Sequence, residues 1–464
     1  MAQTYDLTSG NPRKLILNFF FPMLFTNMLQ QLYTIADTAI VGKGLGDNAL
    51  AAVGNMSSLT FLIIGFSMGL TNGFSVMIAQ HYGASDGKRL RQSVACSVLL
   101  SAAIAIGLTM LSVAFLRPVL TLMQTSEIII DDSLKYGYII FGGLAATIAY
   151  NLCASVLRAL GDSKTPFYAI IVSTIVNILF NYITVFVMGM GVEGPALVTI
   201  LSQVISALIC FARLRRIEMI SVSREDFRDG VVMIPSLLKN GIPMAVMNSI
   251  TAVGCMIVQY FVNGMGVVYT SAYSACSKYI NLFMQPACTA GIAMSSYTSQ
   301  NYGAKKYDRI ISGLKVCLTI AAVSYVLLGS VMIIFPRELA MLMLSGEEQI
   351  ALTELFLTRC GVMLFAVDFL FVFRNACQGM GKPFLPMLSG ILEMILRVAV
   401  IALLTKSMGF TATAYAEIAA WIGALSVNLA AFVYHIKKET AACGEQSSEI
   451  YQYTACKGKI GNNA

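Results

Sequence analysis

Charged residues are scarce in this chain. Only 12% of its 464 residues are Asp, Glu, Lys or Arg, against about 25% in soluble domains. A water-soluble protein of this length needs a charged surface, so the composition excludes that class. The 57% share of hydrophobic residues also excludes an intrinsically disordered chain. The 11 cysteines are scattered, mostly within apolar runs, which argues against a secreted disulfide scaffold.

Histidine and phosphate-binding loops are also lacking. The chain has 2 histidines, His81 and His435, and neither has a carboxylate nearby in sequence or a spacing typical of metal ligands. The closest approach to an ATP-binding loop, residues 379–383, ends in Pro383 where a Mg²⁺-binding Ser or Thr should stand. A membrane-embedded transferase enzyme is therefore a remote alternative. We expect no catalytic residues, no cofactor and no resident metal, with an ion gradient as the energy source.

Long apolar runs dominate what is present. A membrane-spanning helix needs about 20 mostly apolar residues. Twelve stretches qualify: 15–41, 51–80, 91–116, 134–157, 167–188, 195–214, 240–263, 270–298, 311–335, 352–377, 384–405 and 411–435. The pattern predicts an all-α integral membrane protein with twelve transmembrane helices.

The Lys and Arg residues predict the orientation. With the N-terminus in the cytoplasm, most of the 31 basic residues fall on the cytoplasmic side, including Arg213, Arg215 and Arg216 after the sixth span. Both termini are then cytoplasmic. The net charge of +7 is a consequence of this orientation and does not indicate nucleic-acid binding.

The chain resembles itself after 220 residues. Residues 80–84 (QHYGA) match residues 300–304 (QNYGA), and Gly161 matches Gly381 at the same offset. Several matches in one order indicate a duplication. Each half holds six spans, so both halves have the same orientation and form a parallel repeat. We expect a cytoplasmic N-terminus (1–14), a first lobe (15–217), a cytoplasmic linker (218–239), a second lobe (240–436) and a cytoplasmic tail (437–464). Two matching bundles suit alternating access around a site between them.

Asp37 is the first acid that lies within a span. An ionisable side chain in the membrane normally faces the bundle interior or a water-filled cavity. Asp37 lies about 22 residues into the first span, near its outer half, where burial and the helix dipole both disfavour a bare carboxylate. We expect it to take a proton or a cation. The alternative is a carboxylate that reaches the outer surface.

Polar residues of the fifth and sixth spans are predicted at the depth of Asp37. Asn177 and Asn181 are four residues apart and share one helix face, and Thr199 lies near the outer end of the next span. Together these four residues offer oxygen ligands suited to H⁺ or a hard cation such as Na⁺. Ordinary hydrogen bonding between helices is an equally good interpretation of the Asn and Thr residues.

The second half carries its own charged residues. Asp368 in the tenth span is either a site residue or a structural one, with Arg359 or Arg374 as a partner. Glu393 and Arg397 are spaced as an internal ion pair, which Lys278 and Glu417 could join. Asp37 aligns with Ile257 and Asp368 with Ile148, so neither acid is duplicated. For the substrate cavity we expect adaptable or aromatic side chains, with Tyr33, Met56, Phe61, Tyr138, Phe283 and Met284 as candidates.

The motifs resemble those of the multidrug and toxic compound extrusion (MATE) family, most of all its bacterial NorM, DinF and MepA-like branches. The resemblance spans about residues 10–436. It rests on Pro22, residues 32–42 (LYTIADTAIVG), 49–54 (ALAAVG), 80–84 (QHYGA) and 158–162 (RALGD), with their echoes at 300–304 and 379–383.

This resemblance implies a secondary active antiporter that exports amphipathic, often cationic, organic compounds in exchange for H⁺ or Na⁺. It implies a bacterial inner membrane, small-molecule drugs as partners and a monomeric protein. Asp37 matches the family's coupling acid, with Asn177, Asn181 and Thr199 completing the first-lobe site. Some members use a second-lobe site with acids in spans seven and ten. Asp368 matches the latter, but span seven offers only Asn248 and Gln259, which favours the first-lobe site. A lipid-linked saccharide flippase of the same superfamily is the alternative.

Overall fold

The structure is a computed structural model that describes residues 6–123 and 125–460. The predicted N-terminal segment (1–14) and tail (437–464) therefore lie partly outside the described residues. Every regular element in the described part is a helix, which confirms the expected all-α architecture. The first half comprises α1 (Pro12–Leu45), α2 (Asp47–Gly83), α3 (Gly87–Leu122), α4 (Glu127–Gly142), α5 (Leu144–Ala159), α6 (Lys164–Tyr182), the π-helical turn η1 (Ile183–Val187) and α7 (Glu193–Leu214).

The second half repeats this plan. It comprises α9 (Ile234–Asn263), α10 (Val267–Phe283), α11 (Gln285–Gly303), α12 (Tyr307–Ser324), η4 (Tyr325–Gly329), α13 (Ser330–Ile334), α14 (Pro336–Met343), α15 (Glu347–Gly379), α16 (Phe384–Met408) and α17 (Thr411–Ile460). Helices begin at Asp47, Gly87 and Glu127 in the first half. They begin at Val267, Tyr307 and Glu347 in the second half. Each start is 220 residues after its counterpart, so the duplication inferred from the motifs extends to the helix boundaries.

The number of membrane-spanning helices is close to the expected twelve. In the described part, 10 helices are long and apolar enough to cross a membrane, or 11 if α4 and α5 form one span bent by 44°. That bend lies at Gly143, where the side chain of Ile200 from α7 fills the space that a Cβ atom would need. The remaining expected span, 270–298, is α10 with α11, and this pair does not meet the same test of apolarity.

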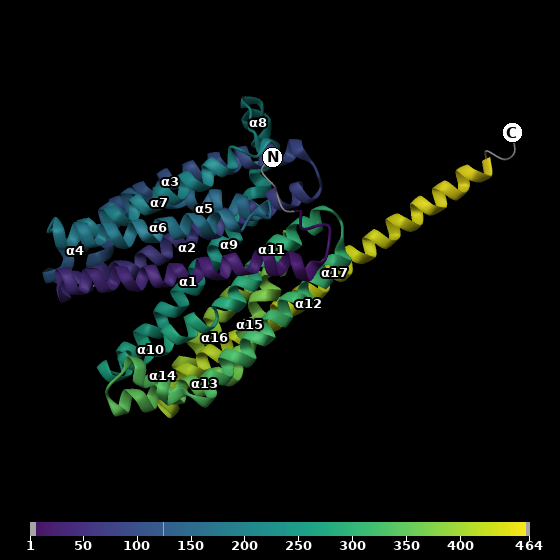
Figure 1. Cartoon of the computed structure of the whole chain (residues 1–464). Coiled ribbons are helices and arrows are strands. Elements are labelled where there is room, and N and C mark those ends of the chain that lie inside the picture. Colours follow the sequence, from purple (N-terminus) through teal and green to yellow (C-terminus); the bar gives the residue numbers. More distant parts are fainter. Residues whose placement is uncertain (1–5, 124, 461–464) are drawn as a thin grey trace.

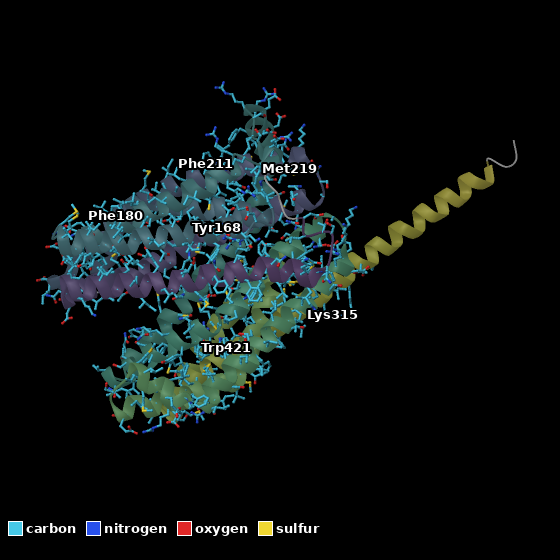
Figure 2. The ribbon with its side chains drawn as sticks, in the orientation of Figure 1. Tyr168, Phe180, Phe211, Met219, Lys315 and Trp421 are labelled. Atoms are coloured by element: carbon cyan, nitrogen blue, oxygen red, sulfur yellow. The ribbon has the colours of Figure 1, made fainter. Side chains whose placement is uncertain are left out.

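The outer faces of the helices are apolar. Tyr168 on α6 and Phe211 on α7 are exposed on the first half, whereas Trp421 of α17 is buried inside the second half (Figure 2). Exposed aromatic and aliphatic side chains of this kind suit the hydrocarbon of a bilayer.

The two halves form separate bundles that meet at one end. In Figure 1 they approach each other around α11 and the beginning of α1, and they diverge toward α4 and α10. The meeting end carries the segments that the basic residues place in the cytoplasm. The segment predicted as a linker (218–239) holds the short helices η2 (Glu218–Ile220), α8 (Arg224–Asp229) and η3 (Gly230–Met233), and α9 begins inside it.

Contacts between the halves follow the repeat. The Gln80 side chain donates from Nε2 to the Gly379 carbonyl at 3.0 Å, and the Gln300 side chain donates from Nε2 to the Ala159 carbonyl at 2.8 Å. These two hydrogen bonds are related by the 220-residue offset. Between them, Gly83 packs against the Gln300 carbonyl and Gly303 against the Gln80 carbonyl, so closely that neither glycine has room for a Cβ atom.

The N-terminal segment adds a strap from the first half to the second. Leu7 is 2% exposed and packs into the core of the second half. Its backbone N–H donates to Oε1 of Gln300 at 2.9 Å, and its carbonyl accepts from Asn301 at 3.1 Å and Arg309 at 3.2 Å. This strap lies at the end where the halves meet, so it helps to hold that end closed.

Candidate functional site

The outer part of α1 carries Asp37 toward α6. The Asn181 side chain donates from Nδ2 to Oδ1 of Asp37 at 2.5 Å and to Oδ1 of Asn177 at 3.0 Å. Both asparagines are fully buried. The structure therefore brings together three of the four residues expected to form the coupling site, and the spacing of Asn177 and Asn181 aligns both with the acid as predicted.

Thr199 joins this group through a tyrosine. The hydroxyl of Tyr33 donates to Oγ1 of Thr199 at 3.2 Å. Tyr33 lies one turn before Asp37 on α1 and shares its face. Tyr136 of α4 also lies near both Asp37 and Tyr33. From the sequence, Tyr33 was expected in the substrate cavity, and Tyr136 was not named as a site residue. The four-residue spacing between Tyr33 and Asp37 could have placed Tyr33 beside the acid.

The local backbone at this site is irregular. Immediately after Asn181, α6 continues as the π-helical turn η1, and the Thr184 hydroxyl donates to the Asn181 carbonyl at 3.2 Å. Single π-helical turns occur often at functional sites because they redirect side chains. No residue pattern in 183–187 predicted this π-helical turn.

The chemistry available here is oxygen coordination or proton binding. The buried Oδ1 of Asn181 and Nδ2 of Asn177 have no hydrogen-bond partner among the described residues. Asp37 has amide and hydroxyl neighbours, and no basic residue of the described part pairs with it. A carboxylate with nearby amide oxygens suits a proton or a hard cation such as Na⁺. No group of three or more His, Cys, Asp or Glu side chains that could hold a metal occurs in the described residues.

Asp368 lies elsewhere and alone. Its side chain on α15 is fully buried, and neither carboxyl oxygen has a hydrogen-bond partner among the described residues. The expected pairing with Arg359 or Arg374 was wrong. Arg359 stacks over the ring of Tyr415 at 5.5 Å, and Arg374 bonds to Glu393 instead.

The predicted partners of Asp368 also have other roles. Asn248 donates from Nδ2 to the carbonyl of Gly65 on α2 at 3.1 Å, which makes it a contact between the halves. Gln259 bonds to Asn263 at 2.7 Å near the end of α9. Asn248 and Gln259 are roughly 16 Å apart along one helix, too far to ligate a single small ion together. Neither residue is hydrogen-bonded to Asp368 in the described part, so the structure does not join the three residues of the possible second-lobe site.

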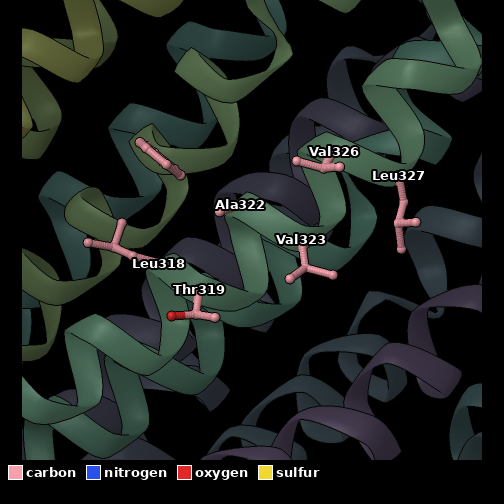
Figure 3. A pocket seen from close by; sticks show the side chains of 7 residues that line it. Leu318, Thr319, Ala322, Val323, Val326 and Leu327 are labelled. Atoms are coloured by element: carbon pink, nitrogen blue, oxygen red, sulfur yellow. The ribbon is translucent and has the colours of Figure 1, made fainter.

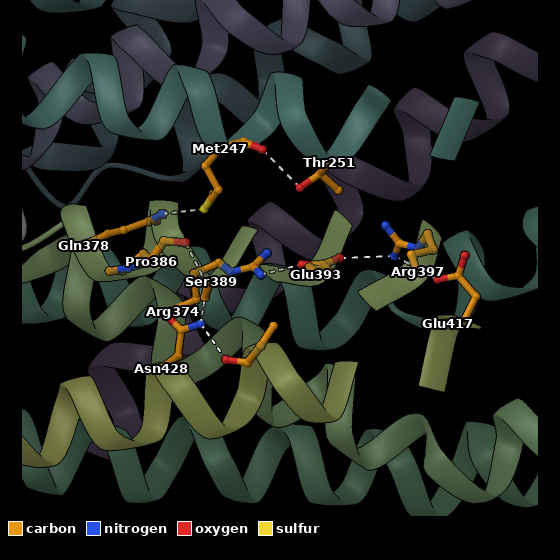
Figure 4. A network of polar contacts seen from close by, with 11 residues as sticks. Met247, Thr251, Arg374, Gln378, Pro386, Ser389, Glu393, Arg397, Glu417 and Asn428 are labelled. Carbon is orange, nitrogen blue, oxygen red and sulfur yellow. Dashed lines mark hydrogen bonds and ion pairs between the residues drawn. The ribbon is translucent and has the colours of Figure 1, made fainter. Parts of the chain in front are cut away.

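A buried chain of charges fills the core of the second half (Figure 4). Arg374 bonds to Glu393 at 2.7 Å, Glu393 to Arg397 at 3.2 Å, and Arg397 to Glu417 at 2.8 Å. All four residues are at most 8% exposed. The expected Glu393–Arg397 pair is confirmed and Glu417 joins it, whereas Lys278 is exposed and stays outside. Two positive and two negative groups neutralise each other, which is typical of a structural element.

The candidate cavity residues divide into two groups. Met56 is fully buried and Phe283 is 8% exposed, and each lies in a hydrophobic core cluster. These two therefore pack the core and do not line a cavity. Phe61 is 65% exposed and Tyr138 is 42% exposed, and Met284 lies at the break between α10 and α11.

A separate depression on the second half is apolar. It has a volume of about 520 Å³ and is lined by Leu318, Thr319, Ala322, Val323, Val326, Leu327 and Phe369 (Figure 3). The lining comes from α12, η4 and α15 and contains no charged side chain. Its chemistry suits a hydrocarbon chain, and it shares no residue with the group around Asp37.

Comparison with protein families gives one match. The family model for MatE matches residues 22–183 and 243–403, one segment in each half. The two matched segments correspond to each other across the internal repeat. They include Asp37, Asn177 and Asn181 of the site, as well as Asp368 and the charged chain up to Arg397.

Relatives of known name are similar over most of the chain. The probable multidrug resistance protein YoeA of Bacillus subtilis is 29% identical, with 75% of this chain and 77% of YoeA covered. The probable multidrug resistance protein YpnP of the same organism is 30% identical, with 66% of this chain and 69% of YpnP covered. A crystal structure described as MATE in complex with MaL6 has the same fold, with a TM-score of 0.89, 20% identity and coverage of 95% of this chain and 100% of that one.

Proposed function

The chain belongs to the MatE family, and from this we propose that it is a secondary active multidrug efflux antiporter. It exports amphipathic organic compounds in exchange for H⁺ or Na⁺, by alternating access of its two halves. The names of the YoeA and YpnP relatives support drug export. We further propose that it works as a monomer in the bacterial inner membrane, with both termini in the cytoplasm and residues 15–217 and 240–436 as the two moving lobes.

The observation that carries the coupling proposal is the hydrogen bond between Asn181 and Asp37. It ties the outer part of α1 to α6 within the first half. The inner part of the same helix contacts the second half, where Asn27 donates from Nδ2 to Oγ1 of Thr289 at 2.9 Å. A proton or cation at Asp37 alters the first tie, and α1 transmits the change to the contact between the halves.

The resulting cycle has two steps. The structure has its halves joined at the end with Gln80, Gln300 and Leu7 and apart at the other, which under the proposed orientation opens the central space to the outside (Figure 1). In this arrangement substrate leaves and H⁺ or Na⁺ reaches Asp37. The halves then close at the outer end and open to the cytoplasm, where the ion leaves and new substrate enters.

Ethidium transport by the purified protein in lipid vesicles tests this proposal. We expect either a proton gradient or a sodium gradient to drive ethidium movement, and Asp37→Asn to reduce the gradient-driven rate at least tenfold. Asp131→Asn, on an exposed residue of α4, is the matched control and should keep the parent rate. Transport that responds to neither gradient contradicts antiport, and normal driven transport by Asp37→Asn contradicts the role of this acid.

A further inference from the structure

The exposed face of α10 is unusually polar for a helix at membrane depth. Ser274, Lys278 and Asn281 are exposed and follow one another at intervals of about one turn. The opposite face, with Cys276, Ile280 and their neighbours, packs into the core of the second half. The polar face explains why α10 and α11 lack the apolarity of the other spans. A lysine in such a span is expected to face a water-filled space, because contact with lipid would be costly.

The exposed face of α10, which carries Lys278, lies opposite the face that packs into the second half, so we expect it to border the space between the halves. On α11, Thr289 receives the hydrogen bond from Asn27 of α1, which marks this face as the contact face. Lys278 lies 11 residues earlier in the chain, beyond the break at Met284 and roughly 16 Å further out. The α10–α11 pair is the counterpart of α2, so α10 continues outward from this contact while the bundles separate (Figure 1).

Lys278 and Asp37 lie at a common depth. Asp37 is ten residues beyond Asn27 on α1, about 15 Å outward from the same contact. Asp37 turns into the first half toward Asn181, and Lys278 has no ion-pair partner among the described residues. Glu393 and Glu417, the acids of the charged chain, are both engaged with Arg397. The positive charge of Lys278 is therefore available to a molecule between the halves.

The opposite wall offers an apolar group. Phe61 on α2 is 65% exposed and lies one turn outward of Gly65, whose carbonyl accepts the hydrogen bond from Asn248 of α9. Phe61 thus shares the face of α2 that meets the second half. Its repeat counterpart on α10 is Asn281, and the counterpart of Lys278 on α2 is Ser58. The two walls differ in chemistry, one aromatic and neutral and the other cationic.

We propose that Lys278 binds the carboxylate or phosphate group of a transported compound, with Asn281 as a flanking hydrogen-bond donor and Phe61 against its apolar part. The transported compounds then include amphipathic organic anions or zwitterions, beside the cations that the family resemblance implies. This inference rests on the proposed function only for the statement that the bound compound is transported. A lysine without an ion-pair partner attracts an anion and repels a cation.

The test uses two fluorescent probes of opposite charge, carboxyfluorescein and ethidium. Binding is measured by fluorescence anisotropy with the full-length protein in phosphatidylcholine vesicles. We expect Lys278→Gln to weaken carboxyfluorescein binding at least tenfold, Lys278→Arg to restore most of it, and ethidium binding to stay the same or tighten. Lys315→Gln, on an exposed lysine of α12 (Figure 2), is the matched control and should bind like the parent.

The outcomes separate the two proposals. Carboxyfluorescein that does not bind, or that binds equally to the parent and to Lys278→Gln, overturns the anion site. Binding that depends on Lys278 without gradient-driven transport keeps the anion site and refutes the antiporter. Adding phosphatidylglycerol to the vesicles identifies the source of the anion. If the lipid lowers the affinity for carboxyfluorescein in the parent but not in Lys278→Gln, the occupant is a phospholipid headgroup. If the affinity is unchanged, the occupant is a water-soluble compound.

Discussion

The two halves share a backbone plan but use charge differently. In the first half, Asp37 lies near amide and hydroxyl groups and has no basic partner among the described residues. The second half pairs four buried charges in the chain from Arg374 to Glu417 and leaves a further buried acid, Asp368, without a hydrogen-bond partner in the described part. At positions related by the repeat, Asp37 corresponds to Ile257 and Asp368 to Ile148. A duplicated fold thus supplies two similar bundles, and residues that are not duplicated give the two bundles different charged sites.

The largest effect on stability is expected from breaking the charged chain. Arg397→Met leaves the Glu417 carboxylate buried without its partner, which costs about 3–5 kcal/mol of unfolding free energy. Asp37→Asn removes no ion pair and should cost about 1 kcal/mol or less. Unfolding of both variants in detergent, followed by circular dichroism against denaturant, measures the difference. Equal losses would show that the charges of the two halves do not differ in role.

The second prediction concerns the glycine contacts at the closed end. Gly83→Val and Gly303→Val each force a side chain into a carbonyl of the other half, at a cost of about 1–3 kcal/mol to the closed arrangement. Since the contacts are related by the repeat, the two variants should act alike. Distances between spin labels on cysteines at Lys88 and Asp308, in a background without the native cysteines, report the separation of the halves. Short distances unchanged in both variants would contradict the proposed closure.

The smallest expected effect is the difference between substitutions of Gln80 and Gln300 in how often the halves separate. Gln80→Ala removes one hydrogen bond between the halves, and Gln300→Ala removes its counterpart and the bond from the backbone N–H of Leu7. Each hydrogen bond contributes about 0.5–1.5 kcal/mol, so Gln300→Ala should open the end where the halves meet more often than Gln80→Ala. The same spin-label distances give the populations. A larger effect of Gln80→Ala would mean that the N-terminal strap does not contribute to closure.

Local patterns in the sequence were sufficient for the architecture. Apolar runs and repeated motifs predicted an all-helical membrane protein made of two similar halves, because both signals depend on residues close together in the chain. The same holds for part of the site. The four-residue spacing of Asn177 and Asn181, and the Glu393–Arg397 pair, are properties of single helices that packing did not change.

Contacts between segments far apart in the chain could not be predicted from the sequence. Nothing near Asn248 indicated that it would bond to Gly65 of α2, and nothing near Asp368 indicated that its carboxyl group would be isolated from Arg374. Met56 and Phe283 could equally have faced a cavity, since an apolar residue suits a core and a binding surface alike.

The sequence by itself therefore determined the composition, the spans, the repeat and the unduplicated acid on which coupling is proposed to depend. Only the tertiary structure decided which helix faces meet. It brought the hydroxyl of Tyr33 on α1 to Thr199 of α7 and the amide of Asn27 on α1 to Thr289 of α11. The physical reason is that helical periodicity fixes the faces of one helix, whereas the partner of each face depends on packing between segments up to about 300 residues apart.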